Sequence, residues 1–164
     1  MVLAHGVVYV HSAPPAICPH VEWALSGVLG DRVSLEWTEQ SAAPGQLRAS
    51  SVWSGAPGTG GRIATALRAW HMLRFEVTEE ATPGSDGERI CYVPGRGIWR
   101  AAMSASGDVM VGESQIADLA RQATCLDDLR SKLATVLGAD VDAELEPYRR
   151  AGDGTAITWL HQVG

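Results

Sequence analysis

The chain has 164 residues, of which 46% are hydrophobic and 20% are charged. This composition is typical of a folded globular protein and excludes an intrinsically disordered one. The formal net charge of −6 disfavours nucleic acid and anionic membranes as partners, because both repel an acidic protein. We expect a single domain over residues 1–164, large enough to fold without disulfides or a structural metal.

The cysteines and the N-terminus predict a cytoplasmic protein. Cys18, Cys91 and Cys125 are scattered and form no CxxC pair, which favours free thiols in a reducing compartment. The first residues lack the basic start and the long apolar core of a signal peptide. No stretch reaches the roughly 18 apolar residues of a membrane-spanning helix.

The first half of the chain, residues 1–80, alternates between strand and helix patterns. Valine-rich or alternating segments predict strands, and apolar residues at i, i+3, i+4 and i+7 predict helices. The resulting order is β-α-β-β-α-β, which is that of the ferredoxin-like split βαβ unit. In chain order we expect a strand at 6–10, a helix from 21 that Gly30 ends, strands at 33–38 and 47–53, a helix over 63–70, and a strand at 73–78.

The second half, residues 81–164, is predicted to extend this unit and to pack on it. A hairpin turns around 94–97 between strands at 88–94 and 97–103, and 108–111 is a possible third short strand. Apolar stripes then predict a helix around 116–123 and another at 126–137, followed by an acidic helix or turn at 139–150. The segment 156–163 is predicted to form a final strand. The expected fold class is therefore α+β.

Acidic residues concentrate in the helical region. Residues 113–146 contain eight acidic and three basic side chains, a net charge of −5 out of the total of −6. On helices with an apolar stripe, such residues usually form the solvated outer face. The alternative is an acidic surface that docks a basic protein partner.

A group of reactive side chains surrounds the first predicted helix start, where His11, Cys18, His20 and Glu22 fall close together in sequence. A thiol at a helix N-terminus has a lowered pKa, and a neighbouring imidazole can accept its proton. An enzyme with Cys18 as nucleophile and His20 or His11 as base is therefore one hypothesis.

The same residues permit two other interpretations. Ligand binding by His11, Cys18 and His20 is possible, but their spacing matches no zinc pattern, so we expect no metal. The simplest interpretation is a well-formed helix start: Pro19 suits the first turn, and Cys18 is a small core residue. His161, near the C-terminus, matters only if the fold brings it to His11 or His20.

The glycine-rich segment 55–62, GAPGTGGR, precedes the second predicted helix. It is not a P-loop, because Gly61 stands where that motif needs lysine and Arg62 where it needs serine or threonine. Backbone amides at a helix start, together with Arg62, can still bind a phosphate or a carboxylate. The candidate ligand-binding residues are Gly58, Thr59, Gly60, Gly61 and Arg62. The alternative is a tight turn with Thr59 as the N-cap.

In an antiparallel β-α-β-β-α-β sheet, the first and third strands are central and the loops that follow them leave from opposite ends. The Cys18 region and the 55–62 loop are therefore expected to be separate sites. Among the tryptophans, Trp37, Trp53 and Trp70 fit the core pattern, whereas Trp23 lies off the stripe of its helix.

Four stretches of the sequence carry a family resemblance: GVVYVHSAPPAICPHVEWAL, WSGAPGTGGRIATALRAWHMLRFEVTEE, ELEPYRRAG and TWLHQVG. Together they are similar to a small actinobacterial protein family classed as a domain of unknown function, over essentially the whole chain. The resemblance implies an intracellular bacterial protein of one domain. It carries over no activity, cofactor or catalytic residue, and suggests a link with lipid or central carbon metabolism.

The sequence as a whole predicts a non-enzymatic binding, regulatory or adaptor module without a cofactor. Its partner would be a protein or a small anionic metabolite, because no complete catalytic motif is present and two helix starts offer anion sites. The alternatives are the Cys18 enzyme and a phosphate or nucleotide site at Gly58–Arg62.

Overall fold

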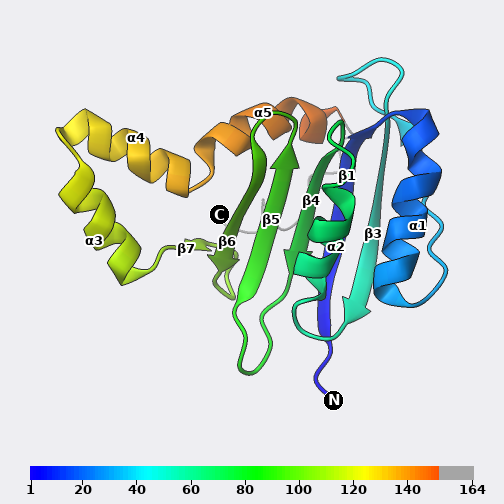
Figure 1. Ribbon diagram of the computed structural model, residues 1–164, viewed down its shortest axis with the longest axis horizontal. Coiled ribbons are helices and arrows are strands. Elements are labelled where there is room, and N and C mark those ends of the chain that lie inside the picture. Colours follow the sequence, from blue (N-terminus) through cyan, green and yellow to red (C-terminus); the bar gives the residue numbers. More distant parts are fainter. Residues whose placement is uncertain (152–164) are drawn as a thin grey trace.

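One seven-stranded antiparallel sheet organises the α+β fold in the computed structural model, which describes residues 1–151 (Figure 1). Its strand order is β2-β3-β1-β4-β5-β6-β7. The strands are β1 (Ala4–Ala13), β2 (Thr38–Glu39), β3 (Leu47–Gly55), β4 (Arg74–Glu79), β5 (Gly87–Val93), β6 (Gly97–Met103) and β7 (Val109–Met110). The α-helices are α1 (Cys18–Leu29), α2 (Thr59–Leu67), α3 (Glu113–Gln122), α4 (Leu126–Val136) and α5 (Ala139–Arg150), and a short 3-10 turn, η1 (Pro15–Ile17), precedes α1.

The first face of the sheet carries the main core beneath α1 and α2. Alternation along β1 and β4 turns Val8, Val10, Phe75 and Val77 to this face, where they are almost fully buried. The helices contribute the apolar stripes that their spacing predicts, with Val21 and Leu25 from α1 and Ile63 and Leu67 from α2. The tryptophan predictions are confirmed: Trp53 is buried, Trp37 and Trp70 pack against this core, and Trp23 is exposed.

The second face is partly covered by α5. Val141 and Leu145 of α5 pack on Cys91 and Val93 of β5 in a small core of their own, with Trp99 at its side. The helices α3 and α4 extend away from the sheet beyond β7 (Figure 1). None of their side chains is fully buried.

The predicted order of the first half agrees with the observed pairing. Within β2-β3-β1-β4, the strands β1 and β3 are central. Gly55, at the end of β3, lies opposite Ala4, at the start of β1, so the loops after these strands do leave from opposite ends. The hairpin β5-β6 and the short strand β7 are also confirmed, and they lengthen this same sheet beside β4.

The predicted strand at 33–38 is wrong, since only β2, Thr38–Glu39, pairs with β3. The preceding amides are bound by side chains of α1 instead of by a neighbouring strand. Leu35 N–H donates to Glu22 Oε1 at 2.9 Å, and Val33 N–H donates to Ser26 Oγ at 2.9 Å. The alternating apolar residues still reach the core, but through an extended segment that is tied to a helix.

The acidic segment 139–150 is a helix, α5. The predicted final strand at 156–163, together with His161 and Trp159, lies outside the described residues. Among the helices within 1–151, none is long and apolar enough to cross a bilayer.

Candidate functional site

The reactive group at the start of α1 does not assemble into one site. Cys18 is buried in the core of the first face, whereas His11 belongs to a polar cluster on the second face. His20 is exposed and lies beside the ring of Trp70. Glu22 accepts hydrogen bonds from Leu35 N–H and from Trp37 Nε1. Over residues 1–151, no three His, Cys, Asp or Glu side chains are grouped so that they could hold a metal ion.

The environment of Cys18 opposes its use as a nucleophile. Its thiol donates a hydrogen bond to Pro14 O at 3.5 Å. Burial is the main cause that raises the pKa of this thiol, which is the reverse of the lowered pKa expected at a helix start. The hypothesis of a Cys18 nucleophile with His11 as base is disfavoured, because the two side chains lie on opposite faces of the sheet.

We predict that Cys125 is alkylated first in the folded protein at neutral pH. It is exposed at the start of α4, whereas Cys18 and Cys91 are buried, so these two should react at least about 100-fold more slowly because local opening must come first. Iodoacetamide labelling followed by peptide mass spectrometry measures the order. Labelling of Cys18 before Cys125 would restore the nucleophile hypothesis.

The glycine-rich loop already holds an anion, and that anion is a side chain of the chain itself. Glu79, at the end of β4, accepts from Gly58 N–H at 2.7 Å and from Gly60 N–H at 2.8 Å. Gly58 is the N-cap, with a φ of +88°, so the expectation that Thr59 fills this position is wrong. Arg62 donates to Val28 O at the end of α1. An external phosphate would have to displace Glu79, which disfavours binding at Gly58–Arg62.

A cluster of buried charges on the second face was not predicted. At its centre is Glu76 of β4, which is fully buried. Arg149 of α5 donates from Nε to Glu76 Oε1 at 2.8 Å and also pairs with it through Nη2. Arg89 Nη2 lies 3.9 Å from the same oxygen, and His11 Nε2 lies 3.6 Å from it. We call these residues, with Asp142, the second-face cluster.

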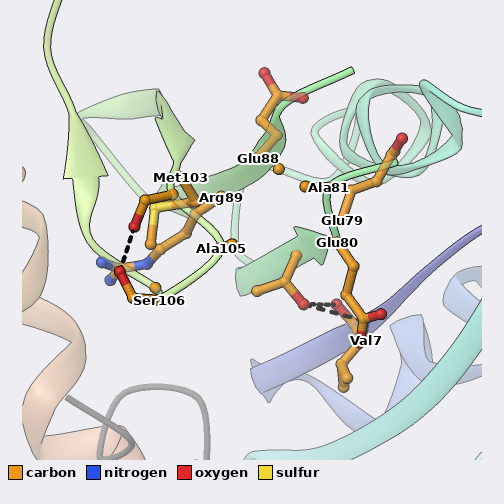
Figure 2. A pocket seen from close by; sticks show the side chains of 13 residues that line it. Val7, Glu79, Glu80, Ala81, Glu88, Arg89, Met103, Ala105 and Ser106 are labelled. Atoms are coloured by element: carbon orange, nitrogen blue, oxygen red, sulfur yellow. Dashed lines mark hydrogen bonds between the residues drawn. The ribbon is translucent and has the colours of Figure 1, made fainter. Parts of the chain in front are cut away.

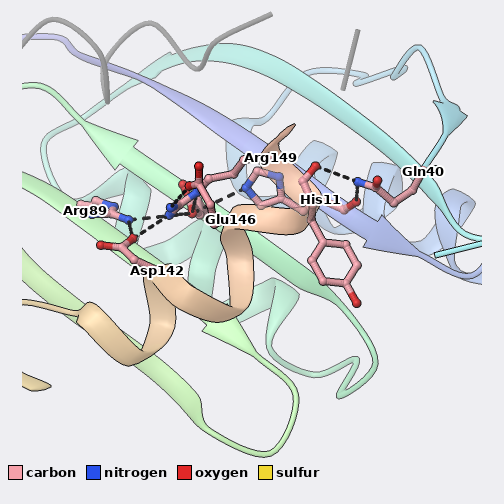
Figure 3. A network of polar contacts seen from close by, with 8 residues as sticks. His11, Gln40, Arg89, Asp142, Glu146 and Arg149 are labelled. Atoms are coloured by element: carbon pink, nitrogen blue, oxygen red, sulfur yellow. Dashed lines mark hydrogen bonds and ion pairs between the residues drawn. The ribbon is translucent and has the colours of Figure 1, made fainter. Parts of the chain in front are cut away.

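Asp142 of α5 completes the second-face cluster by joining its two arginines (Figure 3). Its carboxylate accepts from Arg89 Nη2 at 2.5 Å and from Arg149 Nη2 at 2.9 Å. Burial alone would raise the pKa of Glu76, but His11, Arg149 and Arg89 beside it outweigh burial and lower that pKa to about 2. Glu76 is therefore an ionised carboxylate inside the protein, and Arg149 of α5 is hydrogen-bonded to it.

Gln40 ties the far end of α5 to the sheet. Its amide nitrogen donates to His11 O at 2.7 Å and to Tyr148 O at 3.1 Å, which links β1 to α5 (Figure 3). Two atoms at the centre of the cluster, His11 Nε2 and Glu76 Oε2, are buried and have no hydrogen-bond partner within residues 1–151. Because unpartnered buried polar atoms are rare, they mark this cluster as unusual for a structural core.

Several acids of the helical region serve this attachment of α5. Asp142 binds Arg89 and Arg149, Glu144 binds Arg96, and Glu146 lies within ion-pair distance of Arg149. Part of the acidic concentration at 113–146 is therefore explained, because these acids pair with arginines of the same domain. A basic protein partner for the remaining acids stays a prediction.

A pocket opens on the second face beside the cluster, with a volume of about 410 Å³. Figure 2 shows Arg89, Met103 and Ser106 along one side, and Val7 on the other. We call it the second-face pocket. Its wall comes from β1, the ends of β4 and β5, and the β6-β7 turn; its residues are Val7, Thr78, Glu79, Glu80, Ala81, Gly87, Glu88, Arg89, Met103, Ser104, Ala105, Ser106 and Gly107.

The chemistry of the pocket wall is mixed. Arg89 is a buried cationic residue of the wall, only 3% exposed, and Val7 and Met103 supply apolar surface. Two of the acids in the wall are engaged elsewhere, since Glu79 binds the amides of the glycine-rich loop and Glu88 binds Arg100. Glu80 lies at the exposed rim. The wall therefore offers one buried cation next to an apolar surface.

Sequence reasoning missed Glu76, Arg89 and Arg149. The sequence pattern assigns no role to the polar residues of β4 and β5, and it predicts a solvated outer face for the acids at 113–146, which include those of α5. The partners are 73 residues apart for Glu76 and Arg149, and 53 for Arg89 and Asp142. No local spacing signals such pairs, because only the packing of α5 on the sheet brings them together.

Comparison with family models gives a match over residues 7–162 to the family described as Protein of unknown function (DUF3145). Searches of curated proteins and of solved structures give no match. The family match covers nearly the whole chain, including every residue of the second-face cluster and of the pocket.

Proposed function

We propose that this chain, which belongs to the family Protein of unknown function (DUF3145), is a non-enzymatic module that binds a small anionic ligand in the second-face pocket. The pocket itself is the observation that carries the proposal. Its volume of about 410 Å³ falls within the range of small-molecule sites. A buried guanidinium beside apolar surface is the combination that orients a small molecule with one charged end.

Binding suits the pocket better than catalysis does. A covalent enzyme needs a nucleophile and a base within hydrogen-bond reach of each other. The residues that line the pocket include neither cysteine nor histidine, and Cys18 lies in the core of the other face. The Cys18 enzyme and the phosphate site at Gly58–Arg62 remain alternatives, and each requires a rearrangement of contacts described above.

The proposal also includes three expectations from the sequence: an actinobacterial origin, a cytoplasmic location, and a ferredoxin-like first half. The strand order β2-β3-β1-β4, with α1 and α2 on one face, supports the last of these. In such a sheet the second face is free to carry a site, and here α5 covers only part of it.

Filling the pocket should abolish binding. Val7 lines it from β1, and phenylalanine at this position would occupy part of its volume without cutting a hydrogen bond. We expect native mass spectrometry of the full chain, purified gently from its own cells, to show a metabolite-sized adduct. The adduct should be lost from the Val7→Phe variant.

Val52→Phe is the matched control. Val52 lies opposite Val7 on the neighbouring strand, is 79% exposed, and does not line the pocket. This variant adds the same bulk to the same sheet and should keep the adduct. An adduct that survives in Val7→Phe, or that is absent from the unmodified chain, would contradict binding in the pocket.

A further inference from the structure

Arg89 belongs to two parts of the molecule at once. It forms part of the wall of the second-face pocket, and it also holds α5 through the 2.5 Å hydrogen bond to Asp142. The side chain of Arg89 is 4% exposed, whereas that of Asp142 is 38% exposed. The arginine is therefore fixed inside the protein, and its carboxylate partner lies at the edge, within reach of water.

The same arginine also approaches the junction of α4 and α5. Its guanidinium carbon lies 5.3 Å from the ring centre of Trp99. Trp99 Nε1 donates to Val136 O at the end of α4, and a Cβ on Gly138 would come within 2.8 Å of the Trp99 ring. The contacts that attach the helical region to β5 and β6 thus meet around Arg89.

We infer that the anionic group of a pocket ligand pairs with Arg89 in place of Asp142, so that ligand binding loosens α5. The inference rests on the proposed function of the pocket. The ligand it calls for has a carboxylate or a phosphate at one end and a short apolar body, which would contact Val7 and Met103.

The exchange is chemically balanced. Arg89 exchanges the carboxylate of Asp142 for the anionic group of the ligand, and Asp142 can return to solvent while Arg149 remains paired with Glu76. Because a ligand shifts an equilibrium only through its different affinity for the two states, the state with Asp142 displaced must bind the anion more tightly. Linkage then requires the reverse effect: weakening the contact of Asp142 must strengthen binding of the anion.

The test uses butyrate as the probe, with 1-butanol as the same apolar body without charge and inorganic phosphate as charge without the body. Each is titrated into the full chain and followed by NMR shifts of residues 78–107. We expect butyrate to bind more tightly than 1-butanol and to speed hydrogen exchange of the α5 amides. Butyrate binding tighter than that of phosphate shows that the apolar body contributes to binding, and the reverse order assigns the site to phosphates.

Asp142→Asn is the decisive variant, because asparagine keeps the size of the side chain and removes its charge. It should tighten butyrate binding about fivefold, the factor expected when a partly exposed ionic competitor is lost. Asp140→Asn is the matched control. It removes the same charge from the same helix, but Asp140 lies near Arg96 and not Arg89, so its effect should be small.

The outcomes separate the inference from the proposed function. Equal effects of Asp142→Asn and Asp140→Asn, or unchanged α5 exchange at butyrate saturation, would overturn the coupling while leaving a ligand pocket in place. If none of the three probes shifts the pocket residues, and Val7→Phe changes no adduct, the proposed function and the inference both fail.

Discussion

Replacing Arg149 by methionine should destabilise the protein by about 3–5 kcal/mol, which is the usual cost of leaving a buried charge without its partner. Arg149 is 6% exposed and supplies the principal hydrogen bonds to the fully buried Glu76. Methionine keeps much of the length and apolar body of the arginine, so the loss reports mainly on the stranded carboxylate. Urea unfolding followed by tryptophan fluorescence gives the change in the free energy of unfolding.

The neighbouring residue provides the control. Arg150 has a side chain that is 79% exposed and pairs with Glu146 at the surface, so Arg150→Met should cost less than about 1 kcal/mol. The double variant Glu76→Gln, Arg149→Met should recover much of the lost stability, because it removes the buried charge together with its partner. Equal costs for Arg149→Met and Arg150→Met would refute a central role for the buried pair.

Gly6→Ala should have an effect of similar size, because β1 leaves no room for a side chain there. A Cβ on Gly6 would come within 1.9 Å of Thr78 O in the adjacent strand and 2.5 Å of the Trp53 ring. The carbonyl belongs to the β4 backbone, so the steric clash can be relieved only if the paired strands move apart. We expect a loss of about 3 kcal/mol or more in the same urea experiment, the upper range for single substitutions.

Gly27→Ala is the corresponding control and should change stability in the opposite direction. Gly27 lies within α1, and a Cβ there meets no atom within 4 Å. Alanine in a helix interior is favoured over glycine by about 0.8–1.0 kcal/mol, so this variant should be more stable than the natural chain. A Gly6→Ala protein as stable as the natural one would show that β1 and β4 are not packed as described.

The first of these tests, on Arg149, concerns the same face of the molecule as the proposed site. Glu76 and Arg149 attach α5 to the sheet, and Arg89 connects that attachment to the pocket. A chain that keeps buried ionised groups next to a pocket accepts a stability cost that an apolar core would avoid. We propose that this cost is retained because the cluster lets a ligand act on α5.

Local pattern alone determined most of the elements. The stripe of Ile63 and Leu67 and the alternation around Phe75 required only the helix and strand periods, and all three residues face the core. The hairpin at 94–97 followed from its glycine-rich turn. The strand at 33–38 failed because periodicity reports which residues are buried, not which groups bind the backbone amides.

Only the tertiary structure decided which side chains form the site, because sequence periodicity does not report which distant groups meet. His11, Cys18 and His20 are close in sequence, yet the strand and the helix that carry them direct them to different places. Glu79 and the amides of Gly58 and Gly60 are far apart in sequence, yet they bind each other. Charge–charge contacts act through space, so the sequence supplied the charged groups of the second-face cluster, and only the packing of α5 on the sheet decided which of them meet.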